Sequence, residues 1–140
     1  MISVAVSHDI ERALLELLGG DSGSSANALI HDGIPLSALD RLNEFGLAPT
    51  EIGIVSSRAL RQRRIQGKPL TLREGDCLYR VARLALQADV LFGSRQKALA
   101  WLHQRRHSLG GHSALHAAFT TLGLLAAEEL LGQLKHGYCA

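Results

Sequence analysis

Residues 90–140 read VLFGSRQKALAWLHQRRHSLGGHSALHAAFTTLGLLAAEELLGQLKHGYCA. Glycines divide this stretch into short segments at Gly93, Gly110, Gly111, Gly123 and Gly137. Glycine commonly ends a helix, because it adopts the left-handed backbone conformation needed just after the last turn. Apolar residues recur between the glycines at helical spacing, so the glycines are expected to mark the ends of successive short helices.

Serine residues stand at the start of two of these segments, where a side-chain oxygen can cap a helix. Ser94 is expected to cap a helix that runs through residues 101–102. Ser113 is expected to cap a second helix through Thr121, and Gly123 to separate it from a last helix that ends at His136.

The composition of the 140 residues also favours helices. Apolar residues make up 46% of the chain, enough for a packed core, but aromatic residues make up only 4%. The core must then consist mainly of Leu and Ala, which prefer helix to strand. A chain of this length forms one domain, or two very small ones that share a core. The prediction is an all-α fold without strands.

The chain shows no signal of a membrane or secreted protein. Its apolar runs are too short to span a bilayer, and its first residues do not join a cationic segment to an apolar one. Cys77 and Cys139 are isolated in the sequence, so no disulfide framework is expected. These observations predict a cytoplasmic protein.

The first half of the chain divides at small and turn-forming residues. Ser7 is a candidate cap for the first helix, and residues 19–27 are expected to form a flexible linker. Pro35 suits the start of a later helix, and Ser56 the turn before another. Helices are expected over residues 10–18, 35–45, 50–55 and 58–66.

The longest predicted helix covers residues 72–92. Thr71 and Glu74 form a capping box at its start, in which each side chain accepts a hydrogen bond from the other residue's backbone amide. Its apolar stripe predicts a buried face, made of Leu78, Val81, Ala82, Ala85 and Ala88.

Six basic residues and no acidic one lie between Glu51 and Glu74. Arg58, Arg61 and Arg64 share one helical face, and the short helix before them completes a helix-turn-helix plan. Arginines on such a second helix contact phosphates and guanine edges in DNA. The alternative is a solvated basic surface. The candidate DNA-binding residues are Ser57, Arg58, Arg61, Gln62, Arg63, Arg64 and Lys68.

The spacing FG…WL…LGG…LG…L…G in the last third resembles the toxin-binding domain of the Xre/MbcA/ParS antitoxins. The matching positions are Phe92, Gly93, Ala98, Trp101, Leu102, Leu109, Gly110, Gly111, Leu115, Gly123, Leu131 and Gly137. The middle of the chain resembles one branch of the same family. That likeness rests on Glu51, Val55, Arg58, Leu60 and Arg63, on Pro69, Leu70 and Thr71, and on Glu74, Asp76, Arg80 and Arg83.

This resemblance implies the antitoxin of a type II toxin–antitoxin system. Its partner would be a RES-domain toxin, similar in fold to ADP-ribosyltransferases, that destroys NAD. The antitoxin would cover the mouth of the toxin's active site with its last helix and tail, and would bind the promoter of its own operon. The implied division is an N-terminal extension over 1–32, an Xre-like helix-turn-helix domain over 33–88 and a toxin-binding domain over 89–140.

Apolar residues on the last helix give partly independent support for a partner. Leu124, Leu125, Leu130, Leu131 and Leu134 are more than one small core face needs, and exposed apolar faces often mark interfaces. Packing into the protein's own core, or into a homodimer, is the alternative. The candidate toxin-binding residues are Trp101, Leu109, Gly110, Gly111, Leu130, Leu131, Leu134, Lys135, His136 and Tyr138.

Other chemistry is not expected. His103 and His107 lie four apart, as do His112 and His116, but without a further ligand nearby they are better explained as surface histidines than as a zinc site. The chain has no phosphate-binding loop and no catalytic signature, so neither a cofactor nor an enzyme is predicted. The alternative function is a stand-alone helix-turn-helix regulator whose C-terminal helices only dimerise. A homodimer is expected on DNA in either case.

Overall fold

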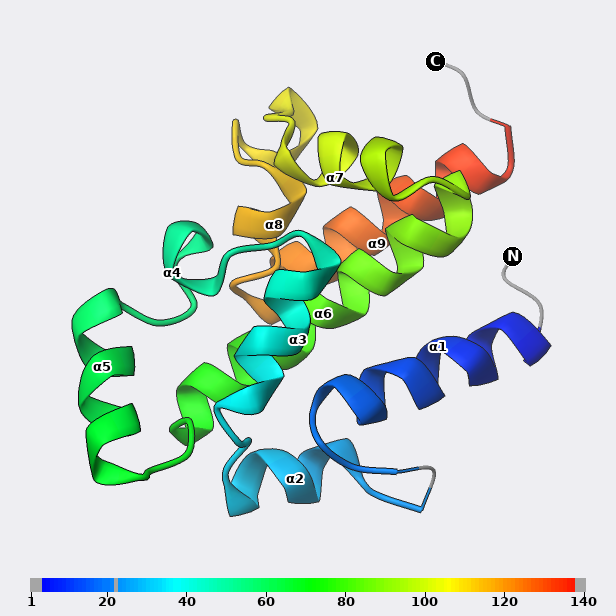
Figure 1. The fold of residues 1–140 in the computed structure, drawn as a ribbon. Coiled ribbons are helices and arrows are strands. Elements are labelled where there is room, and N and C mark those ends of the chain that lie inside the picture. The colour runs from blue at the N-terminus through cyan, green and yellow to red at the C-terminus, as the bar shows by residue number, and fades with distance from the viewer. Residues whose placement is uncertain (1–3, 22, 138–140) are drawn as a thin grey trace. The chain divides into compact units, whose positions relative to one another are not determined.

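The structure, a computed structural model, describes residues 4–21 and 23–137. The predicted all-α fold is confirmed (Figure 1), since these residues contain no strand beyond an isolated bridge between Arg105 and Ser113. The helices are α1 (Val4–Leu17), α2 (Ala26–Asp32), α3 (Ser37–Phe45), α4 (Pro49–Ile52), α5 (Ser57–Gln66), α6 (Leu72–Phe92), α7 (Arg95–His103), the 3-10 turn η1 (His107–Leu109), α8 (Ala114–Ala117) and α9 (Thr121–Lys135).

Contacts divide the chain into two compact units. The first is Glu11–Tyr79, and the second combines Arg80–Ala140 with Met1–Ile10. The division falls within α1 and within α6. The functional division over 1–32, 33–88 and 89–140 has other boundaries and stays a prediction.

Aliphatic side chains form the core of the unit Glu11–Tyr79. Its fully buried members include Leu14, Leu18, Ile34, Leu39, Leu42, Leu47 and Leu78. Arg41 donates from Nε to the carbonyl oxygen of Leu17 at 2.8 Å, which ties α3 to the end of α1. The amide of Leu70 donates to the carbonyl oxygen of Ile34 at 2.9 Å. This hydrogen bond joins the segment before α6 to the segment before α3.

The N-terminal segment is more helical than predicted. α1 begins at Val4, so Ser7, the predicted cap, lies inside the helix and not at its start. α2 was not predicted at all, because residues 19–27 were expected to form a linker. Ser25 caps α2 by accepting the amide of Ala28 at 3.3 Å, and Ile30 is buried. At the other end of this helix of seven residues, the Gly33 amide donates to the carbonyl oxygen of Leu29.

α4 is shorter than the helix predicted over residues 50–55. It ends at Ile52 because Gly53 takes the left-handed conformation, with φ +96°, and donates its amide to the carbonyl of Pro49 at 3.2 Å. Ile54 and Val55 then pack into the core from the link between α4 and α5. The segment before the basic helix is thus a single helical turn and a buried connection.

α6 has the predicted cap and the predicted buried face. Thr71 Oγ1 accepts the amide of Glu74 at 3.2 Å, and Glu74 Oε1 accepts the amide of Thr71 at 2.9 Å. The predicted stripe of Leu78, Val81, Ala82, Ala85 and Ala88 is buried throughout.

The helices after Ser113 differ from the prediction at Gly123. Ser113 caps α8 as expected, but α8 ends at Ala117, and Gly123 lies in the first turn of α9. A methyl group added at Gly123 would overlap the carbonyl oxygen of Ala117. Gly123 therefore permits α8 and α9 to approach each other closely, and it does not separate two helices.

Candidate functional site

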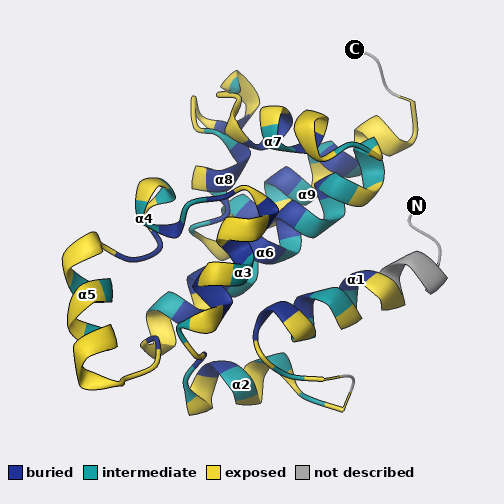
Figure 2. Cartoon of the chain, viewed as in Figure 1, coloured by how far each residue is buried: buried dark blue, intermediate teal, exposed yellow. Residues whose placement is uncertain are grey.

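α5 is a basic helix that lies on the surface of its unit. None of its ten residues is buried, as Figure 2 shows. Ser56 Oγ accepts the amide of Ala59 at 3.0 Å, and Gly67 ends the helix with φ +67°. Because an isolated helix of this length is marginal in water, these caps and a few side-chain contacts must hold α5 in place.

The candidate DNA-binding residues do not share one environment. The exposed ones are Ser57, Arg58, Arg61, Gln62, Arg64 and Lys68. Arg64 lies 3.6 Å from Asp40 in an exposed pair, which contributes little to stability. These side chains are accessible to a partner, and their contact with DNA stays a prediction.

Arg63 differs from the other basic residues of α5. Its Nη1 lies 2.6 Å from Glu74 Oε2, and only 18% of its side chain is exposed. Glu74 thus uses one carboxylate oxygen for the capping box and the other for Arg63. The pair joins the C-terminal half of α5 to the first turn of α6. This structural task could not be inferred from sequence, where Arg63 was one member of a basic run.

The aromatic and glycine positions of the last third organise the backbone of their unit. Trp101 is buried, and its ring centroid lies 6.1 Å from that of Phe92. Leu109 is also buried. Gly110 and Gly111 have φ of +68° and +84°, two consecutive left-handed residues that side chains would strain. These residues maintain the fold here, and their direct contact with a toxin stays a prediction.

Arg80 and Arg83 hold the α8–α9 region onto α6. Arg80 donates to the carbonyl oxygens of Ala118 and Phe119, each at 2.9 Å, where α8 ends. Arg83 Nε lies 3.1 Å from Glu128 Oε2 on α9. In the sequence, both arginines are matching positions of the family resemblance, and no structural role could be assigned to them. Their spacing of three, on one side of a long helix, was the available signal.

The leucines of α9 divide between the core and the surface. Leu124 and Leu131 are buried, and Leu130 is half-buried. Leu125 and Leu134 remain 55% and 42% exposed, and Leu122, which was not singled out, is 79% exposed. Lys135 and His136 are exposed at the end of α9. Tyr138 lies outside the described residues.

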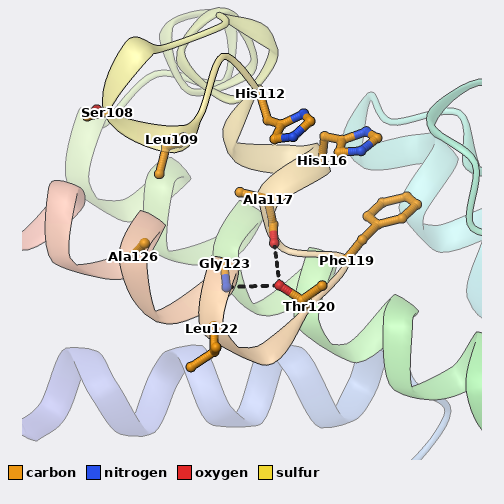
Figure 3. Close-up of a pocket in the computed structure, with 10 residues that line it drawn as sticks. All are labelled: Ser108, Leu109, His112, His116, Ala117, Phe119, Thr120, Leu122, Gly123 and Ala126. Carbon is orange, nitrogen blue, oxygen red and sulfur yellow. Dashed lines mark hydrogen bonds between the residues drawn. The ribbon is translucent and has the colours of Figure 1, made fainter.

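A cleft of about 460 Å³ lies between α8 and α9 (Figure 3). We call it the α8–α9 cleft, lined by Ser108, Leu109, His112, His116, Ala117, Phe119, Thr120, Leu122, Gly123 and Ala126. The rings of His112 and His116 stack with centroids 4.6 Å apart, and Phe119 stacks on His116 at 5.5 Å. Its surface is therefore mainly apolar, with a wall of flat rings.

A second cleft, of about 430 Å³, lies between the loop after α7 and the C-terminal half of α9. We call it the arginine cleft, lined by Trp101, Gln104, Arg105, Arg106, His107, Ser108, Leu130, Gln133 and Leu134. The Arg106 guanidinium lies over the Trp101 ring, 4.8 Å from its centroid. Trp101, Leu130 and Leu134 of the toxin-binding prediction are thus brought together here.

The histidine pairs and the cysteines are the remaining sequence features. The part of the chain that the structure describes contains no group of three or more side chains placed to hold a metal ion. The side chain of Cys77 is buried. No described helix is both long and apolar enough to cross a membrane.

Comparison with known proteins gives two findings. Residues 87–137 match the family model described as the antitoxin Xre/MbcA/ParS C-terminal toxin-binding domain. A protein of Pseudomonas putida KT2440 named "Antitoxin Xre" is 33% identical over 129 residues, covering 91% of this chain and 81% of the relative. The matched region begins near the end of α6 and includes α7, η1, α8 and α9, which hold both clefts.

Proposed function

Because the chain belongs to the Xre/MbcA/ParS family and is the antitoxin of a toxin–antitoxin system, we propose that it neutralises a RES-domain toxin. That toxin degrades NAD, and α9 with the tail after it covers the mouth of its active site. Action in the cytoplasm, where cellular NAD is consumed, is part of this proposal.

The observation that best supports toxin binding is the match of residues 87–137 to a toxin-binding domain. Within that region, Leu122, Leu125 and Leu134 are exposed on α9. Exposed leucines beside a cleft favour a partner interface, because burying them removes apolar surface from water. The buried Trp101 and Leu109 act on this interface indirectly, by holding the loop before α8.

Co-expression with the adjacent gene, followed by measurement of cellular NAD, tests this function. The neighbour alone should deplete NAD, and this chain should restore it and form a stable complex on size exclusion. A Leu122→Ser, Leu125→Ser variant should lose protection while keeping its melting temperature, because both side chains are exposed. Ile65→Ser, an exposed change on α5, is the matched control and should protect normally. A neighbour that leaves NAD intact would contradict the proposal.

We propose further that α5 binds the operator of the antitoxin's own operon, as a homodimer on paired half-sites. Six of the seven candidate side chains are exposed, whereas the seventh, Arg63, is mostly buried in its pair with Glu74. The alternative, a stand-alone DNA-binding regulator, would use the same exposed α5, but it does not account for the match of residues 87–137 to a toxin-binding domain. The two differ in the co-expression test, because a stand-alone regulator would bind DNA and leave the neighbouring product unbound.

A further inference from the structure

The arginine cleft carries positive charge that the described residues of its unit do not pair with a carboxylate. Arg83 is paired with Glu128, and Arg95 is paired with Asp89 at 2.9 Å. Within the described residues, neither Arg105 nor Arg106 forms an ion pair. None of the described residues that line the cleft is acidic. Two adjacent arginines thus face a cleft without a carboxylate.

Arg106 is held in position without its charge being compensated. It stacks on Trp101, and its Nη2 donates to the Trp101 carbonyl at 3.4 Å and to Gln104 Oε1 at 3.3 Å. Its Nε is buried and makes no hydrogen bond within the described residues. Burial lowers the pKa of the Arg106 guanidinium below its usual value. A guanidinium partly removed from water gains from an anionic partner.

The opposite wall of the cleft is apolar. Leu130 is half-buried and Leu134 is exposed, both on the C-terminal half of α9. The cleft volume of about 430 Å³ lies at the low end of the range for small-ligand sites. It therefore suits one or two inserted side chains, one charged and one apolar, better than a whole helix.

We propose that the arginine cleft receives an acidic side chain of the toxin, whose apolar neighbour packs against Leu130 and Leu134. This inference rests on the proposed toxin partner and adds the chemistry of one contact. A carboxylate there forms charge-assisted hydrogen bonds with Arg105 and Arg106, and a planar guanidinium can bind it through two parallel bonds. Because Arg106 is already held by stacking on Trp101, its side chain loses less conformational entropy when it binds a carboxylate.

The test is the affinity of the full-length antitoxin for the product of the adjacent gene, purified in a catalytically inactive form. The variants are Arg105→Glu, which reverses an exposed charge, and Arg106→Gln, which removes the charge of the guanidinium stacked on Trp101. Arg12→Glu is the matched control, because Arg12 is exposed on α1 and the change in net charge equals that of Arg105→Glu. Melting temperatures establish that each variant is folded. If Arg106→Gln does not fold, Arg105→Glu alone decides the result.

Both cleft variants should bind at least about tenfold more weakly at low salt, as expected for a charge at a desolvated contact. For Arg105→Glu the difference should shrink at high salt, and an acidic residue of the toxin changed to Lys should restore binding. Arg12→Glu should bind within about twofold of the native chain. Native-like binding by both cleft variants, or equal weakening by Arg12→Glu, would overturn the inference while leaving toxin binding intact. If the cleft variants lose operator binding but still bind the toxin like the native chain, the two arginines serve DNA binding, and the inference is also overturned. Failure of the native chain to bind would instead remove the proposed function.

Discussion

Gly123 and Gly132 lie in the same helix, yet replacing each with alanine should have opposite effects. Alanine is favoured over glycine in a helix by up to about 1 kcal/mol. A methyl group at Gly132 would meet nothing within 4 Å. Gly132→Ala should therefore stabilise the protein by about 0.5–1 kcal/mol.

The same methyl group at Gly123 would overlap the carbonyl oxygen of Ala117 and lie 2.6 Å from its carbonyl carbon. Both contacts are with backbone, so no side-chain rotation can relieve them, and α8 or the first turn of α9 must shift. Overpacking of this kind costs up to about 3 kcal/mol. The shift also endangers the bond from the Gly123 amide to Thr120 Oγ1, 3.0 Å long, and a lost cap costs about 1 kcal/mol. After subtracting the helix-propensity gain, the net destabilisation is about 3 kcal/mol.

Thermal unfolding followed by circular dichroism at the helical minimum measures both changes. For a chain of this size, 1 kcal/mol corresponds to about 3–4 °C. Gly123→Ala should lower the melting temperature by about 10 °C, and Gly132→Ala should raise it by about 2–4 °C. If Gly123→Ala melts within about 2 °C of the native chain, the close approach of α8 and α9 does not occur as described. A loss at Gly132 equal to that at Gly123 would refute the steric reason.

Four further predictions concern polar contacts and the basic helix. Arg80→Ala should lower the free energy of unfolding, measured in urea, by about 3 kcal/mol, because two carbonyl oxygens at the end of α8 lose a charged donor. A decrease below about 0.5 kcal/mol would mean that water replaces the guanidinium. Thr71→Ala should cost about 1 kcal/mol in the same assay by removing one half of the capping box, and Thr71→Ser should recover most of it. Arg61→Ala should leave the melting temperature unchanged. The slope of log K for operator binding against log salt concentration should become shallower by about one, because one phosphate contact is lost. Arg63→Ala should instead lower the melting temperature, because it breaks the pair with Glu74; equal melting temperatures for the two variants would show that Arg63 has no structural task.

Helix ends could be predicted wherever the deciding residues lie within three or four positions of one another. The capping box of Thr71 and Glu74 and the caps at Ser94 and Ser113 are of this kind. The buried stripe of α6 was predictable for a similar reason, since the helical repeat alone places its residues on one face. The resemblance to the antitoxins depended on glycines and apolar residues at fixed spacings, and these are visible in the chain.

Contacts between distant residues were decided by packing, and local rules do not reach them. Arg80 and the carbonyls at the end of α8 are 38 and 39 positions apart, and Arg83 and Glu128 are 45 apart. Gly123 was misassigned because only the approach of α8 shows why a side chain cannot fit there. Likewise, the repeat of leucines in α9 predicts an apolar helix, but which leucines stay exposed depends on what the neighbouring helices cover. Local propensity and capping act along the chain, whereas burial and ion pairing depend on neighbours that only folding brings together.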